Sequence, residues 1–152
     1  MQNNKTLNIG AGTKLLSGAV NVDIIPGEGI TVCDIRKGLP FDDESFSDVI
    51  ADYVLCQICD KNDFVKVMNE IWRVLKVGGL LKMKVPDARF PCAFQDPMDC
   101  RYFVQETFDY FDQDHYRYKA FNYGFKPWEI VKVEKERTDR IYAELKKPDV
   151  KS

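Results

Sequence analysis

The chain of 152 residues lacks several features that would assign it to common functional classes. It has one histidine, His115, and no apolar run that approaches the roughly 20 residues of a membrane-spanning helix. It also has no basic run, since 22 lysines and arginines stand against 24 acidic residues and the net charge is −2. We therefore expect no nucleic-acid groove and no membrane contact. The stretch MQNNKT has no apolar region typical of a secretory signal, so we expect a cytoplasmic protein.

Cysteines are few, and their spacing follows no disulfide framework. The five are Cys33, Cys56, Cys59, Cys92 and Cys100. An odd, irregular set is typical of reduced thiols in a reducing compartment. Cys56 and Cys59 form one CxxC that could supply half of a metal site, but no second CxxC exists and His115 is far along the chain. We expect buried thiols and no metal.

The hydrophobic pattern predicts five short strands, one clear helix and a terminal hairpin. The strands are expected at residues 6–10, 19–25, 30–35, 47–51 and 80–85. Apolar residues that recur at intervals of three and four predict a helix capped by Asp63 and stopped by Gly78. Two β-rich stretches within residues 128–145 predict an antiparallel pair. This order is typical of an α/β fold with a mostly parallel sheet, and we expect one domain over residues 1–152.

The stretch LNIGAG, residues 7–12, places a glycine turn at the end of the first predicted strand. Glycines let backbone N–H groups approach a ligand, and an acidic residue after the second strand, here Asp23, can accept both ribose hydroxyls. A dinucleotide site would need a third glycine where this chain has Leu15. The connection of nine residues, 11–19, is too short for a crossover helix that could hold a pyrophosphate. We expect a nucleoside ligand without phosphates, with S-adenosylmethionine as the leading candidate.

Four segments together resemble the class I S-adenosylmethionine-dependent methyltransferases, in particular the small type 11 kind in which a short loop replaces the first crossover helix. They are LNIGAG, VNVDI, CDIRKGLPFDDESFSDVI and EIWRVLKVGGLLKMKVPD, within residues 7–87. DPMDCRYFVQETFDYF, from Asp96, is similar to a segment that follows the fifth strand in these relatives. The resemblance implies a Rossmann-like sheet with a shortened first crossover, and S-adenosylmethionine as cofactor.

The resemblance also implies a set of cofactor-binding residues. They are Gly10, Ala11, Gly12, Asp23, Ile24, Asp34, Ile35, Asp52 and Tyr53. The glycine turn would line the methionine and ribose, Asp23 would bind the ribose hydroxyls, and Asp34 with Ile35 would meet the adenine. Asp52 and Tyr53 would face the methionine end. Two alternatives stay open: Asp34 could close a turn, and Tyr53 could be a core residue.

The chain departs from the relatives at three histidines. Where relatives often read SHVLEH it reads DYVLCQ, with Tyr53 and Gln57 at the histidine positions, and Asp99 replaces the histidine of DPxHxR. Roles of those histidines are therefore not carried over. Methyl transfer from a sulfonium depends mainly on alignment of the acceptor, so a general base is optional. Candidate bases are Tyr53, Asp52 and Asp87, with Asp99 and His115 further along the chain.

Residues 90–128 hold 13 of the 19 aromatic residues. This density indicates either a layer over the core or the wall of an apolar pocket, and we expect a cap over the carboxyl ends of the strands. Two functions follow: in-line methyl transfer to a small-molecule acceptor, or a non-catalytic module with the same fold that binds the cofactor or a partner. A homodimer could complete the site of so small a domain.

Overall fold

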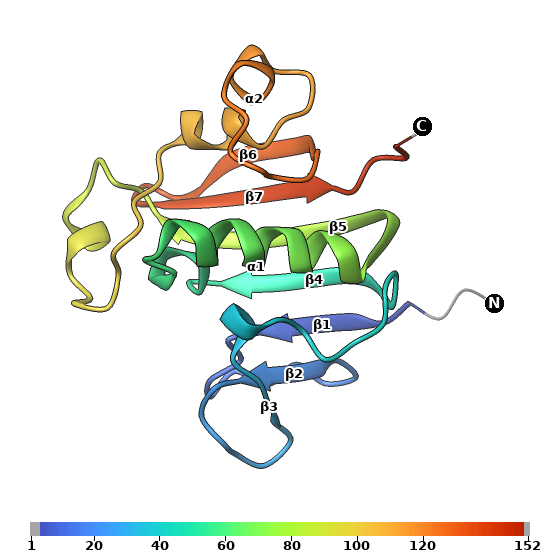
Figure 1. Cartoon of the computed structure of the whole chain (residues 1–152). Coiled ribbons are helices and arrows are strands. Elements are labelled where there is room, and N and C mark those ends of the chain that lie inside the picture. The colour runs from blue at the N-terminus through green and yellow to red at the C-terminus, as the bar shows by residue number, and fades with distance from the viewer. Residues whose placement is uncertain (1–3, 151–152) are drawn as a thin grey trace.

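The computed structural model describes residues 4–150, which form a seven-stranded sheet in the order β3-β2-β1-β4-β5-β7-β6 (Figure 1). The strands are β1 (Thr6–Ile9), β2 (Val20–Asp23), β3 (Thr31–Val32), β4 (Phe46–Asp52), β5 (Leu75–Pro86), β6 (Glu129–Arg137) and β7 (Arg140–Lys146). The first five strands are parallel, and β7 runs antiparallel between β5 and β6. The predicted fold class, a mostly parallel sheet with an antiparallel pair at the carboxyl end, is confirmed.

In the described part of the chain, two α-helices and four short 3-10 helices connect the strands. They are η1 (Ile35–Lys37), η2 (Leu55–Gln57), α1 (Lys61–Val74), η3 (Pro91–Phe94), η4 (Gln105–Tyr110) and α2 (Tyr116–Ala120). The long helix α1 lies across β4 and β5 on one face of the sheet (Figure 1). Within residues 4–150, we find no helix with the length and apolar character that a membrane crossing requires.

Helix α1 differs from its predicted bounds at both ends. Its cap is Asp60, whose carboxylate accepts a hydrogen bond from the backbone N–H of Asp63 at 3.0 Å. The helix ends at Val74, ahead of the predicted stop at Gly78, because Leu75 is fully buried and already pairs with Phe46 of β4. Strand pairing therefore sets the end of the helix before the glycines are reached.

The connection between β1 and β2 contains no helix, as the short spacing predicts. Two buried asparagines hold it in place: the Asn8 amide donates to Asn21 Oδ1 at 2.9 Å and to the Lys14 carbonyl at 3.1 Å. Asn21 in turn accepts from Leu16 N–H at 3.0 Å and donates to the Leu16 carbonyl at 3.1 Å. These side-chain amides satisfy backbone groups that a helix would otherwise pair within itself.

The face of the sheet opposite α1 carries ion pairs in place of a helical layer. The pairs are Asp48–Lys82, Lys84–Glu136, Lys132–Glu144 and Lys146–Glu129. The side chains of Asp48 and Lys82 are 28% and 36% exposed. A parallel sheet usually buries both faces. Here the residues that alternate with the core residues along the strands form ion pairs with one another and stay in contact with water.

The aromatic segment, residues 90–128, divides into two parts. The later part begins with a layer that packs on α1: Phe103, Phe108 and Phe111 are buried, and the rings of Phe103 and Phe111 lie 6.3 and 6.1 Å from the ring of Phe64. The earlier part, residues 90–102, lies at the carboxyl ends of the parallel strands, at the left of Figure 1. Only this earlier part lies where the sequence predicts a cap.

Candidate functional site

A pocket of about 270 Å³ opens at the carboxyl ends of β1, β2 and β4. Six of the nine predicted cofactor residues line it: Gly10, Asp23, Ile24, Asp34, Ile35 and Tyr53. Ala11, Gly12 and Asp52 do not. The pocket is also lined by residues that the sequence did not indicate, namely Cys33, Arg36, Val54, Gln57 and Ile58. Segments far apart in the chain therefore meet at one edge of the sheet.

The glycine turn requires glycine for two separate reasons. Gly10 has φ +64°, a left-handed conformation, and a Cβ built there would overlap Val54 Cγ2. Gly12 has φ +52°, and its N–H donates to Asp23 Oδ2 at 2.9 Å. Between them, Ala11 is buried and its N–H donates to the Val22 carbonyl at 3.0 Å. The turn is thus fixed against the end of β2.

Asp23 is the acidic residue at the end of β2, and it is half-buried at the pocket. Its Oδ2 accepts from Gly12 N–H and its Oδ1 accepts from Ile25 N–H, both at 2.9 Å. An ionised carboxylate has about four acceptor positions. Each oxygen therefore keeps capacity to accept a further hydrogen bond from a ligand.

Asp34 closes a turn and also lines the pocket. It caps η1 by accepting from Arg36 N–H at 3.1 Å, and its two oxygens also accept from Arg36 Nε and Nη2, each at 2.9 Å. These side-chain hydrogen bonds to Arg36 lower the pKa of Asp34 below its usual value. Asp34 therefore remains an ionised acceptor at the pocket edge.

Tyr53 follows β4 in a conformation that is rare for a large side chain, with φ +58°. Its hydroxyl lies 3.5 Å from Glu136 Oε2, and the Arg140 guanidinium carbon lies 5.7 Å from its ring centre. Burial raises the pKa of Tyr53, so the phenol stays protonated and can donate. A strained aromatic residue at the pocket is the kind of feature that functional sites retain.

Glu136 is a residue near the site that sequence reasoning missed. The register of β6 against β7 shifts between Lys135 and Arg137, and this irregularity surrounds Glu136. Glu136 reaches Tyr53 and also forms an ion pair with Lys84 at 2.8 Å. A β-bulge can turn a side chain to a new direction, as here for Glu136. Nothing in the sequence indicates where this bulge lies.

Two predicted bases lie outside the pocket lining. Asp52 belongs to the sheet face opposite the core, since Ala51 before it is fully buried, and burial raises the pKa of Asp52. Asp87 is fully buried, and Arg89 binds its carboxylate through Nη2 at 2.6 Å and Nε at 3.1 Å. The hydrogen bonds from Arg89 lower the pKa of Asp87. This geometry argues against Asp87 as a base.

The two further candidates have separate structural settings. His115 caps α2, where its Nδ1 accepts from Arg117 N–H at 3.2 Å, and its Nε2 lies 3.6 Å from Asp109 Oδ2. Asp99 lies beside the pocket, where its Oδ1 accepts from Gln57 Nε2 at 3.2 Å. Of the two, only Asp99 contacts a pocket residue.

The expectation of five reduced thiols is wrong for two of them. Cys59 and Cys100, 41 residues apart, form a disulfide with a Cα–Cα distance of 5.5 Å. The pairing was hidden in the sequence because residue 100 returns to this loop only through tertiary contacts. Cys56 is free and buried, and burial raises its pKa to about 12, so its thiol stays protonated. Among residues 4–150 we find no trio of histidine, cysteine or acidic side chains arranged for a metal ion.

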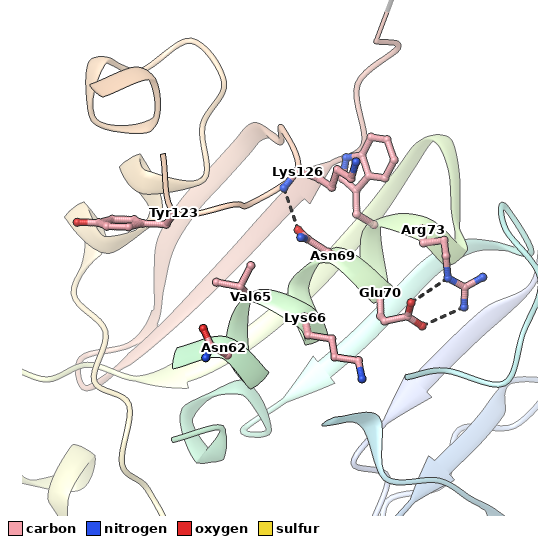
Figure 2. Close-up of a pocket in the computed structure, with 9 residues that line it drawn as sticks. Asn62, Val65, Lys66, Asn69, Glu70, Arg73, Tyr123 and Lys126 are labelled. Atoms are coloured by element: carbon pink, nitrogen blue, oxygen red, sulfur yellow. Dashed lines mark hydrogen bonds and ion pairs between the residues drawn. The ribbon is translucent and has the colours of Figure 1, made fainter. Parts of the chain in front are cut away.

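A larger cavity of about 640 Å³ lies on the outer surface of α1, as Figure 2 shows. Its lining shares no residue with the pocket at the strand ends. Asn69 anchors the neighbouring loop, donating to the Gly124 carbonyl at 2.9 Å and accepting from Lys126 N–H at 2.8 Å. Glu70 and Arg73 pair with each other at 3.0 Å. These polar groups serve the fold, so we place the candidate site at the strand ends.

Comparisons with known proteins give the family and the fold of the chain. A family model described as a methyltransferase domain matches residues 7–83. A solved structure of a protein from Pyrococcus horikoshii is 17% identical, with a TM-score of 0.67, and the match covers 95% of this chain and 82% of that one. No curated protein matches in sequence.

Two further solved structures hold a ligand. The N-methyltransferase NodS from Bradyrhizobium japonicum, in complex with S-adenosyl-L-homocysteine, is 13% identical with a TM-score of 0.65, over 96% of this chain and 79% of that one. The 1,6-didemethyltoxoflavin-N1-methyltransferase from Burkholderia thailandensis, with bound 1,6-didemethyltoxoflavin and S-adenosylhomocysteine, is 13% identical with a TM-score of 0.67, over 95% and 71%. At such identities these likenesses establish a shared fold.

Proposed function

The chain belongs to the methyltransferase domain family, and from that membership we propose that it transfers the methyl group of S-adenosylmethionine to a small-molecule acceptor. One observation carries the proposal. The pocket at the strand ends unites a glycine turn, the carboxylate of Asp23 and the ring of Tyr53. The cavity on the outer surface of α1 has a carboxylate, that of Glu70, but no glycine in its lining.

The residues of the pocket suit an adenosine group. Asp23 has free acceptor capacity for the two ribose hydroxyls, and Ile24, Ile35 and Ile58 supply apolar walls for a flat base. Asp34, held ionised by Arg36, can accept from the amino group of adenine. The volume of about 270 Å³ lies near the lower end of ligand pockets, as expected for a nucleoside group without phosphates.

S-adenosylmethionine, when bound, supplies a methyl group attached to a positively charged sulfonium. Because the sulfur leaves as a neutral thioether, the leaving group needs no proton, and a general base is optional. The work left to the chain is to orient the acceptor and to keep water out. We propose that the Tyr53 hydroxyl contacts the acceptor, and that Glu136, held by Lys84, fixes the direction of that hydroxyl. Tyr53 is then the catalytic residue of the site, and Glu136 is its positioning residue.

Calorimetry with S-adenosylhomocysteine, NAD and ATP tests the proposal. We expect the first to bind at least about tenfold more tightly than the other two, because the short β1–β2 connection offers no helix N-terminus for phosphates. Tighter binding of NAD would overturn the proposal. A methyl-release assay across fractions of small metabolites then identifies the acceptor.

A second candidate function follows from the surface beside the pocket. Phe94, Met98 and Tyr102 are 59%, 65% and 46% exposed on the earlier part of the aromatic segment. Such a surface favours a module that binds the cofactor and acts only with a partner chain or a second copy. Cofactor binding without methyl release from the isolated chain, and methyl release once a partner is added, would favour this candidate.

A further inference from the structure

One covalent link supports the wall of the cofactor pocket. The Cys59–Cys100 disulfide joins the loop after β4 to the earlier part of the aromatic segment. Cys59 directly follows Ile58, which lines the pocket together with Gln57. Cys59 is also an exposed residue, so a thiol in solution can reach the link.

The same short stretch that carries Cys100 makes the other contacts to this wall. The N–H groups of Cys100 and Arg101 donate to the Cys56 carbonyl at 3.0 and 2.9 Å. Arg101 Nε donates to the Ile58 carbonyl at 2.9 Å, and Asp99 accepts from Gln57 Nε2 at 3.2 Å. All of these contacts require residues 99–101 to stay beside residues 56–58, and the disulfide enforces that proximity.

We propose that the redox state of the Cys59–Cys100 pair sets the affinity of the site for S-adenosylmethionine, with the disulfide form binding more tightly. This inference rests on the proposed function. When the link opens, the wall has additional conformations, and only those with Gln57 and Ile58 in place bind the cofactor. If the reduced wall holds the binding geometry roughly one-tenth of the time, the apparent Kd rises about tenfold.

The chemistry requires only a small thiol of the glutathione class as reductant. Its thiolate attacks the sulfur of Cys59, the S–S bond breaks, and Cys100 leaves as a thiolate that takes up a proton. A second small thiol then attacks the mixed disulfide and releases Cys59 as a thiol. One protein disulfide and two small thiols become two protein thiols and one small disulfide.

The test measures the Kd of S-adenosylhomocysteine by calorimetry for the oxidised and the reduced wild-type protein, with mass spectrometry to verify each state. We expect about tenfold weaker binding after reduction. Cys59→Ser should bind S-adenosylhomocysteine as weakly as the reduced wild-type protein does, in oxidising and in reducing buffer alike. Cys92→Ser is the matched control, because Cys92 contacts the Asp139 carbonyl and lies outside the link, so it should respond as wild type does.

Three outcomes would overturn the inference. Equal affinity of the two wild-type states would refute the coupling while leaving the proposed function intact. If mass spectrometry finds no disulfide-linked peptides containing Cys59 and Cys100 after oxidation, the protein does not form the link. Binding by neither state would refute the proposed function, and this inference with it. Should Cys59→Ser fail to fold, the two states of the wild-type protein still decide the matter.

Discussion

Replacement of Asp23 by alanine should weaken cofactor binding far more than it weakens the fold. In the proposed complex, the carboxylate accepts from two ribose hydroxyls. A hydrogen bond to a charged group contributes about 1.5–3 kcal/mol. We therefore expect Asp23→Ala to lose at least about 1.5 kcal/mol of binding free energy, which is more than tenfold in Kd.

The cost to the fold should be smaller, for a reason visible in the structure. Asp23 accepts from the N–H groups of Gly12 and Ile25, and both of those residues are exposed. Water can replace the carboxylate at both groups, so the free energy of unfolding should fall by about 1 kcal/mol. Asn21→Ala should show the opposite balance, because Asn21 is buried and holds Asn8 and Leu16. Its loss leaves the buried Asn8 amide without one of its partners, at a cost of about 1–3 kcal/mol.

Calorimetry with S-adenosylhomocysteine and urea unfolding measure the two quantities on the same samples. Asp42→Ala is a matched control, since it removes the same charge from an exposed residue outside the pocket lining and should leave Kd unchanged. An analogue without the ribose hydroxyls should lose much less affinity on Asp23→Ala than the parent ligand. An unchanged Kd for the parent ligand would remove Asp23 from the site.

Three other predictions follow from the geometry. Gly10→Ala should lower the free energy of unfolding by about 1–3 kcal/mol in urea titrations, because the backbone there is left-handed and the added Cβ would overlap Val54. A second substitution, Val54→Ala, should recover part of that loss of stability. If it recovers none, the overlap with Val54 is not a cause of the loss. Glu70, whose pKa is lowered by hydrogen bonds from Arg73, should stabilise the fold above the usual carboxyl pKa of about 4.3 and cease to do so as pH falls through the lowered value. The difference in free energy of unfolding between wild type and Glu70→Gln should therefore shrink from pH 7 to pH 3. A difference that stays constant over this range would show that the ionised Glu70 carboxylate does not stabilise the fold. In hydrogen exchange, the Trp128 amide, which donates to the Phe111 carbonyl, should be protected without ligand. Within the aromatic segment, S-adenosylhomocysteine should add protection only at residues 90–102, and ligand-dependent protection at Trp128 would show that the later part of the segment is not a fixed layer.

Much of the fold follows from local signals in the sequence. The β-branched runs and the glycine turn predict the parallel strands, and the spacing of nine residues predicts a β1–β2 connection without a helix. Asp23 could be singled out because a carboxylate at the end of a second strand has a position-specific use. Such signals depend on neighbours in the chain, which a single sequence displays.

The remaining features depend on contacts between distant residues. The pairing of Leu75 with Phe46 ends α1 early, although the helical pattern runs on toward Gly78. Glu136 comes near Tyr53 only through an irregular register, and Cys59 meets Cys100 only after the chain folds back. Periodicity and turn chemistry contain no information on such pairings, which the tertiary structure alone decides.

The charged face of the sheet and the short β1–β2 connection constrain one another, with a consequence for protein engineering. A longer helical segment grafted in place of residues 13–18 would pack over β1 and its neighbours, on the face where β4 and β5 carry the ion pair Asp48–Lys82. Covering this ion pair would remove its hydration, at a cost of several kcal/mol per ion. A successful graft must therefore replace the ion pair with apolar residues in the same step. The two features form a matched set that recombination between this chain and a helix-covered relative would break.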